Sequence, residues 1–201
     1  MSESDLKQNS PAMQPITGLI LAGGAGRRIG GQDKGMLKWR GQPLAAHVAA
    51  RLRPQVDKLI ISCNRNQAYY ATLADDIVSD TRPYYQGPLA GLESARNHIE
   101  TDLLLIAPCD APMLPLDLCR RLQIAVRNMP NRICYAHDGN RPQYLCAMMW
   151  AALLEQLPDY LDAGHRAVHQ WYSGQDTHVV DFSDQAAAFI NCNSRLDLED
   201  A

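Results

Sequence analysis

Glycines and basic residues gather in one short stretch near the start of the chain, at residues 23–34. Five glycines stand there among Arg27, Arg28 and Lys34. Glycine lets the backbone turn sharply and approach a ligand closely, so that several N–H groups face one anion. Arginine and lysine add positive charge that attracts phosphate oxygens. Because an apolar, strand-like run at residues 16–22 precedes it, this stretch indicates a phosphate-binding loop; the alternative is an ordinary surface loop.

The loop matches neither of the two most common phosphate-binding motifs. Gly26 and Gly31 have the spacing of a P-loop, but the Lys and the Ser or Thr that must follow are missing. Gly24 and Gly26 begin a dinucleotide-binding fingerprint, but Ile29 occupies the position of its third glycine. The sequence therefore indicates a phosphate loop of another kind.

Aspartates follow two of the later apolar runs. Asp110 closes the most continuous run, at residues 102–110, and Asp80 follows a shorter one around residue 77. Mg²⁺ prefers a small number of carboxylates together with phosphate oxygens and water. Asp110 is therefore the candidate metal ligand beside a bound nucleoside triphosphate. The alternative is that Asp110 caps a helix that begins shortly after it.

Strands and helices that alternate along the chain must position these residues. Apolar periodicity predicts strands at residues 16–22, 56–63, 77–78, 102–110, 132–137, 144–148 and 177–180. It predicts helices at residues 43–52, 67–73, 89–99, 115–129, 150–157 and 164–172, and a last one from about residue 193. This order predicts an α/β fold, a Rossmann-like three-layer α/β/α arrangement around a mostly parallel sheet. Ligands of such sheets bind beyond the carboxyl ends of the strands, so the loop, residues 62–65, Asp80 and Asp110 are expected at one edge.

Composition restricts the class of protein. The 201 residues are 46% hydrophobic and 20% charged, which predicts a single domain at residues 16–201 after a disordered tail at residues 1–15. A formal net charge of −3 argues against a nucleic-acid partner. No apolar run predicts a signal peptide or a membrane span. The six cysteines include no C-x-x-C pair, so we expect reduced thiols in a cytoplasmic protein.

The loop also carries a resemblance to a known family. The sequence LAGGAGRRIGGQDKGML at residues 21–37 resembles the L-A-G-G…R-M-G…D-K signature of nucleotidyltransferases that activate small phosphorylated molecules. Its form is most similar to that of the molybdenum cofactor guanylyltransferases, with Ile29 in place of the usual Met. Three later segments fit the same family: GPLAG at residues 87–91, PCDAP at residues 108–112 and VDFSD…FINCN at residues 180–193.

The resemblance implies a fold, a reaction and partners. The implied fold is of the nucleotide-diphospho-sugar-transferase type. The implied reaction transfers GMP from GTP to the phosphate of molybdenum-bound molybdopterin and releases pyrophosphate, with Mg²⁺ as cofactor. The family also implies contact with proteins of molybdenum cofactor synthesis and with apo-molybdoenzymes or their chaperones.

The same resemblance assigns roles to individual residues. Asp110, Lys34 and Arg28 would be catalytic, with Asp110 holding the metal ion. The implied GTP contacts are Leu21, Ala22, Gly23, Gly24, Lys34, Ser62, Asn64, Asp80, Gly87, Pro88, Leu89 and Asp110. The candidates on the acceptor side are Asn191, Asn193, Arg166 and Asp138, although a turn explains Asp138 better. Many relatives have N-x-N-R where this chain has Ser-Cys-Asn-Arg, and a serine at residue 62 reaches less far than asparagine.

Nucleotidyl transfer asks the protein mainly to position reactants and to stabilise charge. We expect the acceptor's phosphate to attack the α-phosphorus of GTP in line, without a general base because the phosphate is already ionised. Two enzyme alternatives remain: a cytidylyltransferase of the same pterin and one of an isoprenoid intermediate. An alternative of another class is a nucleotide-binding regulator or carrier that performs no transfer.

Overall fold

The computed structural model describes residues 14–24, 26, 30–127 and 129–192. A seven-stranded sheet forms its centre, in the order β5-β4-β1-β6-β8-β7-β9. In chain order these strands are β1 (Ile16–Leu21), β4 (Lys58–Ser62), β5 (Asp76–Val78), β6 (Leu103–Pro108), β7 (Arg132–His137), β8 (Pro142–Trp150) and β9 (Asp176–Asp181). The first four are mutually parallel, β8 runs antiparallel to both of its neighbours, and β9 is parallel to β7. The predicted mostly parallel sheet is thus confirmed.

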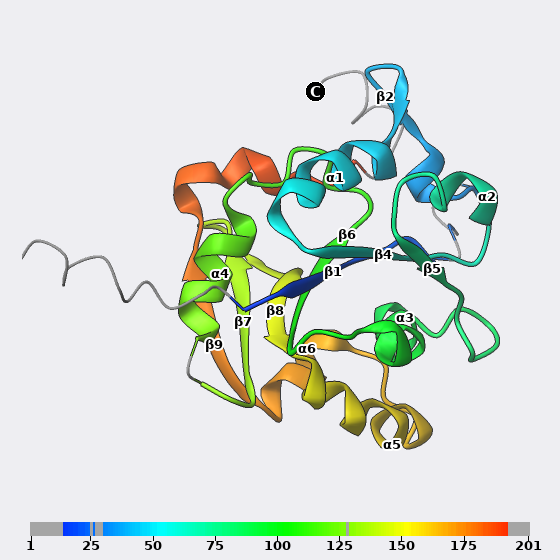
Figure 1. Ribbon diagram of the computed structural model, residues 1–201. Coiled ribbons are helices and arrows are strands. Elements are labelled where there is room, and N and C mark those ends of the chain that lie inside the picture. The colour runs from blue at the N-terminus through cyan, green and yellow to red at the C-terminus, as the bar shows by residue number, and fades with distance from the viewer. Residues whose placement is uncertain (1–13, 25, 27–29, 128, 193–201) are drawn as a thin grey trace, which may run out of the picture.

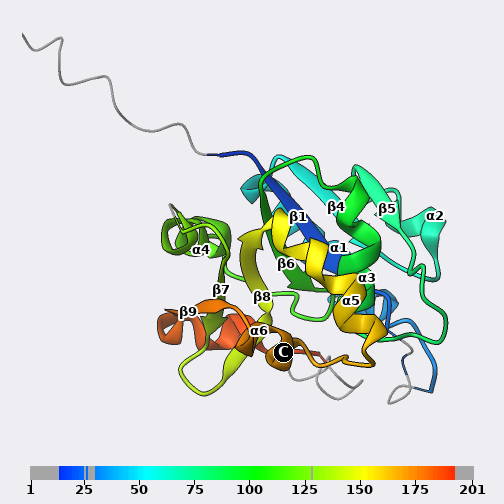
Figure 2. The same cartoon turned by 90° about the horizontal axis from the view of Figure 1, so that it is seen from below.

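Helices cover both faces of this sheet. The α-helices are α1 (Leu44–Leu52), α2 (Gln67–Tyr70), α3 (Pro88–Ala95), α4 (Leu118–Val126), α5 (Leu157–Asp162) and α6 (Val168–Ser173). Figure 1 shows α1 and α3 on opposite faces of β1 and β4. Figure 2 shows α4 beside β7, and α5 next to α3. The predicted three-layer α/β/α fold is therefore confirmed.

The core consists of two apolar layers that β1 separates. Ile20 packs into the layer beneath α1 and α4, whereas its neighbour Leu19 packs into the layer beneath α3, α5 and α6. Successive residues of a strand point to opposite faces, so a strand covered on both faces is largely apolar. This is why β6 is a continuous apolar run in the sequence, and why Thr17 is the only residue of β1 with a polar side chain.

Several predicted boundaries are wrong. The helix expected at residues 150–157 is a 3-10 helix, η5 (Ala151–Gln156), and a separate α5 follows it, with Pro158 in its first turn. Proline suits the first turn of a helix because no N–H is needed there. Pro43 lies outside α1, in the short hairpin of β2 (Lys38–Trp39) and β3 (Gln42–Pro43), which was not predicted. The helix from residue 193 lies outside the described residues.

Two composition-based expectations concern the described part of the chain. No helix there has the length and apolar character needed to span a bilayer. All six cysteines are buried free thiols. Most of the expected disordered tail, residues 1–13, lies outside the described residues.

Candidate active site

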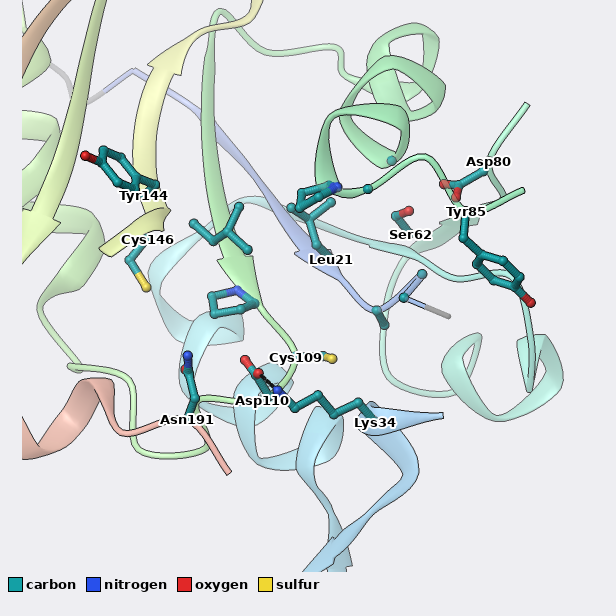
Figure 3. A pocket seen from close by; sticks show the side chains of 18 of the residues that line it. Leu21, Lys34, Ser62, Asp80, Tyr85, Cys109, Asp110, Tyr144, Cys146 and Asn191 are labelled. Carbon is teal, nitrogen blue, oxygen red and sulfur yellow. Dashed lines mark hydrogen bonds and ion pairs between the residues drawn. The ribbon is translucent and has the colours of Figure 1, made fainter. Parts of the chain in front are cut away.

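A cavity of about 410 Å³ opens at the carboxyl ends of β1, β4 and β6 (Figure 3). Its lining includes most of the predicted nucleotide contacts: Leu21, Ala22, Gly23, Gly24, Lys34, Ser62, Asp80, Gly87, Pro88 and Asp110. The sheet holds this edge together beyond the strands, because the N–H of Ala22 donates to the carbonyl of Ser62 over 2.8 Å. The expected meeting of distant segments at one sheet edge is therefore found.

Lys34 points from the glycine-rich loop toward the end of β6. It begins a short 3-10 helix, η2 (Lys34–Met36), whose N-cap Asp33 accepts a hydrogen bond from the Gly35 N–H over 3.1 Å. The buried Asp33 carboxylate also accepts from the Tyr70 hydroxyl over 2.8 Å. These bonds fix the turn, and the Lys34 ammonium donates to Oδ2 of Asp110.

Asp110 presents one oxygen that the described residues leave unpaired. The residue as a whole is only 8% exposed, and Oδ1 has no hydrogen-bond partner among them. The main chain around it is fixed, because its carbonyl accepts from the Cys192 N–H over 2.9 Å. A buried carboxylate oxygen without a hydrogen-bond partner destabilises the folded protein, and a ligand or metal ion that binds this oxygen removes that cost. Asp110 is thus a strand-end carboxylate that faces a cavity, and not a helix cap.

Ser62 faces the same cavity from the end of β4. Its hydroxyl is buried and has no hydrogen-bond partner among the described residues. Gly91 of α3 lies against it: a Cβ built at Gly91 would come within 2.7 Å of Ser62 Oγ and 3.1 Å of Leu21 Cδ2. Only glycine therefore lets α3 approach this edge. Gly91 was not among the predicted site residues, although the GPLAG segment contains it.

Asn64 supports the site from behind. Its amide donates to the Gly23 carbonyl over 3.0 Å and to Oδ2 of Asp80 over 2.8 Å, and it does not line the cavity. Asp80 does line it, and its Oδ1 has no partner among the described residues. Burial raises the pKa of Asp80 above its ordinary value, and the hydrogen bond from Asn64 offsets only part of that shift. The ligand-facing group of this pair is the aspartate.

Besides Gly91, Pro108 and Cys109, which lie within the GPLAG and PCDAP segments, five lining residues escaped the sequence analysis altogether. They are Tyr85, Gln143, Tyr144, Leu145 and Cys146. The last four belong to β8. Because β8 runs antiparallel to β6, its beginning lies beside the end of β6 and so reaches the cavity. Tyr85 has a φ of 51°, a left-handed conformation that is uncommon for a residue with a side chain. No local sequence pattern announces either arrangement.

Other predicted site residues lie elsewhere. Leu89 is fully buried in the apolar layer beneath α3, because the first turn of that helix points its side chain into the core. The Arg166 guanidinium donates to the carbonyls of Leu161 and His165, each over 2.6 Å, and does not line the cavity. Asp138 accepts from the N–H groups of Asn140 and Arg141, each over 2.8 Å, so the turn interpretation is correct. Asn191 lines the cavity, whereas Arg28 and Asn193 lie outside the described residues.

Comparison with known proteins places the chain in a family. A family profile described as the MobA-like NTP transferase domain matches residues 18–178. A molybdenum cofactor guanylyltransferase of Shewanella piezotolerans is 40% identical over 179 residues, which are 89% of this chain and 88% of that protein. The chain belongs to this family. A molybdenum cofactor guanylyltransferase of Shewanella loihica is 41% identical over 179 residues, which are 89% of this chain and 91% of that protein. Membership makes the chain a nucleotidyltransferase.

Solved structures of low sequence identity share the guanylyltransferase family's fold. The molybdopterin-guanine dinucleotide biosynthesis protein A of Archaeoglobus fulgidus superposes with a TM-score of 0.75 at 20% identity, covering 92% of this chain and 95% of that one. A 4-diphosphocytidyl-2C-methyl-D-erythritol synthase of Anaerococcus prevotii gives 0.71 at 11% identity, covering 94% and 96%. The sheet and its helices are thus those of the predicted nucleotide-diphospho-sugar-transferase type.

The cavity of this nucleotidyltransferase suits a metal ion that arrives with a nucleotide. Among the described residues, no group of three or more His, Cys, Asp or Glu side chains is placed to hold a metal by itself. Mg²⁺ bound together with a triphosphate needs only one or two protein carboxylates, because phosphates and water complete its shell. Asp110, with its unpaired buried Oδ1, is such a carboxylate.

Proposed function

We propose that this protein transfers GMP from GTP to the phosphate of molybdenum-bound molybdopterin, forming the guanine dinucleotide and releasing pyrophosphate. The observation that carries the proposal is the meeting of Lys34 and Asp110 in one cavity with the glycine loop. The names of the Shewanella relatives support guanine as the base and the molybdenum cofactor as the product.

The arrangement of charges fits an in-line displacement. Figure 3 shows Asp110 between Lys34 on one side and Asn191 on the other. The β- and γ-phosphates would lie along the glycine loop, where Lys34 offsets the charge that grows on the departing pyrophosphate. The acceptor's phosphate would then enter from the side of Asn191 and β8, opposite the leaving group.

Asp110 would hold Mg²⁺ through its free oxygen. When bound, this ion would offset negative charge at the α-phosphate. In the structure without ligands, Lys34 and Asp110 offset each other's charge within the cavity. Binding of the nucleotide would replace this contact with one between Lys34 and phosphate oxygens. Asp110 would then be left to bind the metal ion.

No covalent nucleophile is needed, and the thiols that line the cavity are not in reactive form. Cys109 and Cys146 both belong to this lining. Burial, reinforced by the nearby Asp110, raises the pKa of each thiol well above its ordinary range. The thiols therefore remain protonated, and a protonated thiol is a poor nucleophile. The ionised acceptor phosphate is the attacking group.

The proposal is tested by supplying one nucleoside triphosphate at a time. Wild-type protein and the Asp110→Asn variant are incubated without oxygen with Mg²⁺, molybdenum-loaded molybdopterin and GTP, CTP, ATP or UTP. Mass spectrometry is expected to find a dinucleotide with wild type and GTP. A product from CTP but not from GTP would replace the proposal with cytidylyl transfer.

We also propose a cytoplasmic location and direct handover of the cofactor to proteins that make or accept it. The buried free thiols of all six cysteines support a reducing compartment. An affinity purification from an anaerobic extract is expected to recover proteins of molybdenum cofactor synthesis or molybdoenzyme maturation. Recovery of none would remove the support for handover.

A further inference from the structure

Three consecutive residues after β4, at positions 64–66, donate hydrogen bonds to the glycine loop. Asn64 donates to the Gly23 carbonyl over 3.0 Å, and Asn66 donates to Oδ2 of Asp33 over 2.8 Å. Between them, Arg65 donates to carbonyls on both limbs of the loop. The contacts of residues 64–66 thus run from one end of the loop to the other, over a sequence separation of about forty residues.

The Arg65 guanidinium closes the mouth of the loop. Nη1 donates to the Gly31 carbonyl over 2.5 Å. Nη2 donates to the Gly24 carbonyl over 3.1 Å and to the Gln32 carbonyl over 3.3 Å. A single planar fork with five donors can reach three carbonyls at once, and a lysine ammonium has no such fixed geometry.

The position of Arg65 argues against a direct phosphate contact. Its side chain is half-buried and does not line the cavity, whereas the loop residues Gly23 and Gly24 do. The donors of its guanidinium are directed to main-chain carbonyls of the loop. In a peptide unit the N–H points opposite to the carbonyl, so holding the carbonyls of Gly31 and Gln32 also fixes the directions of the Gln32 and Asp33 N–H groups.

We propose that Arg65 is a positioning residue that pre-arranges the described ends of the glycine loop, at Gly24 and at Gly31 and Gln32, for the triphosphate. A glycine-rich loop loses much conformational freedom when it is fixed, which would otherwise weaken triphosphate binding. Arg65 holds the two ends of the loop together before the ligand arrives, and pre-arrangement of this kind raises affinity by lowering the entropic cost of ordering on binding. The identity of the ligand, a nucleoside triphosphate, rests on the proposed function, whereas the contacts of Arg65 are observed in the structure.

Arg65 also connects the loop to a second segment that lines the cavity. Its guanidinium carbon lies 6.0 Å from the centre of the Tyr85 ring, at the outer limit of a cation–π contact. Tyr85 lines the cavity on the side of Gly87 and Pro88. The Arg65 side chain therefore contacts both the glycine loop and the segment before α3.

The first test measures the loop without any ligand. Hydrogen exchange of the peptide that covers residues 22–36 is compared among wild type, Arg65→Ala, Arg65→Lys and the control Arg132→Ala. Arg132 pairs with Asp176 over 2.9 Å at the far strands of the sheet. We expect exchange about tenfold faster in both Arg65 variants and unchanged in the control. Wild-type exchange rates in the Arg65 variants would overturn the proposal, whatever reaction the protein performs.

The second test measures a series of ligands that share one base. We expect Arg65→Ala to weaken GTP binding and to lower kcat by about a hundredfold, while guanosine and GMP bind as in wild type. Arg65→Lys is expected to resemble Arg65→Ala, because the fork and not the charge is needed. Equal weakening for guanosine, or full recovery with lysine, would contradict the proposal. If wild type binds GTP but transfers nothing, the proposed function fails, and the exchange and affinity measurements still decide the role of Arg65.

Discussion

The ammonium of Lys34 donates a hydrogen bond to the carboxylate of Asp110, although 76 positions separate the two residues in the sequence. The bond joins the glycine loop to the end of β6, two elements that phosphoryl-transfer chemistry needs side by side. Their side chains are 28% and 11% exposed, so the pair lies at the cavity surface and not in the core. Its placement argues for a role with ligands, because a partly exposed ion pair adds little to stability.

Asp110→Asn separates catalysis from folding. The amide keeps the shape of the side chain but loses the charge that would hold a metal ion. We expect transfer to fall by about a hundredfold or more, with a melting temperature close to that of wild type. Initial rates and thermal melts measure the two quantities. A transfer rate equal to that of wild type would remove Asp110 from the mechanism.

Ser62→Ala is expected to change stability and binding in opposite directions. The variant removes a buried hydroxyl that has no partner among the described residues, so the free energy of unfolding should stay equal or rise by up to about 1 kcal/mol. The dissociation constant of GTP should rise by about tenfold, because one hydrogen bond to the ligand is lost. Urea unfolding and calorimetric titration measure the two effects.

Ser79→Ala is the matched control for Ser62→Ala. Ser79 Oγ donates to the Cys63 carbonyl over 2.8 Å and accepts from Gln67. Losing this hydroxyl should lower stability by about 1 kcal/mol and leave GTP affinity unchanged. If Ser62→Ala behaves like this control, its hydroxyl is structural and not a nucleotide contact.

Gly91→Ala should damage the nucleotide site by crowding. The added methyl would lie 2.7 Å from Ser62 Oγ, so α3 or the end of β4 must shift. We expect a loss of about 1–3 kcal/mol in unfolding free energy and a weaker affinity for GTP. Gly174→Ala is the control, because its methyl would meet its nearest neighbour at an ordinary 3.6 Å. Unchanged GTP affinity in Gly91→Ala would show that this close approach does not shape the site.

Asp80→Asn is predicted to stabilise the ligand-free protein at neutral pH. Burial raises the pKa of Asp80 above its ordinary 3.8, so between these two pKa values the folded state holds a proton that the unfolded state has lost. Wild-type stability therefore falls as pH rises from 3.8 through the raised pKa, and the advantage of Asn should disappear in acid. Urea midpoints between pH 8 and pH 4 measure this trend, and a constant difference across that range would contradict it.

Asp75→Asn is predicted to change stability in the direction opposite to Asp80→Asn. A hydrogen bond from Arg53, joined by the Leu59 N–H, holds the pKa of Asp75 below its ordinary 3.8. Its contribution to stability is present above 3.8 and is lost as pH falls through the lowered value. The asparagine variant should therefore be less stable than wild type at neutral pH.

The sequence predicted best the elements whose residues are buried on both faces. β1 and β6 are recognisable because nearly all of their residues are apolar, and such parallel strands bring their ends to a common edge. The polar residues that follow these strands are therefore expected together, and Lys34, Ser62, Asp80 and Asp110 all line the cavity.

The residues that escaped prediction depend on strand direction and on backbone conformation. Tyr144 reaches the cavity only because β8 runs opposite to β6, and local periodicity does not reveal strand direction. Tyr85 lines it through a left-handed backbone that its residue type does not favour. Leu89 was assigned to the nucleotide through the family resemblance of its GPLAG motif, whereas its place in the first turn of α3 turns its side chain into the core.

The central claim, that this chain transfers a nucleotidyl group and does not merely bind one, is tested most directly by following labelled phosphorus. GTP labelled at the α-phosphate and GTP labelled at the γ-phosphate are each incubated with the protein, Mg²⁺ and molybdenum-loaded molybdopterin. We predict that the α-label enters the pterin dinucleotide and that the γ-label leaves as pyrophosphate, in equal amounts. Tight GTP binding with neither label moved would contradict the account and would identify a nucleotide-binding carrier or regulator instead.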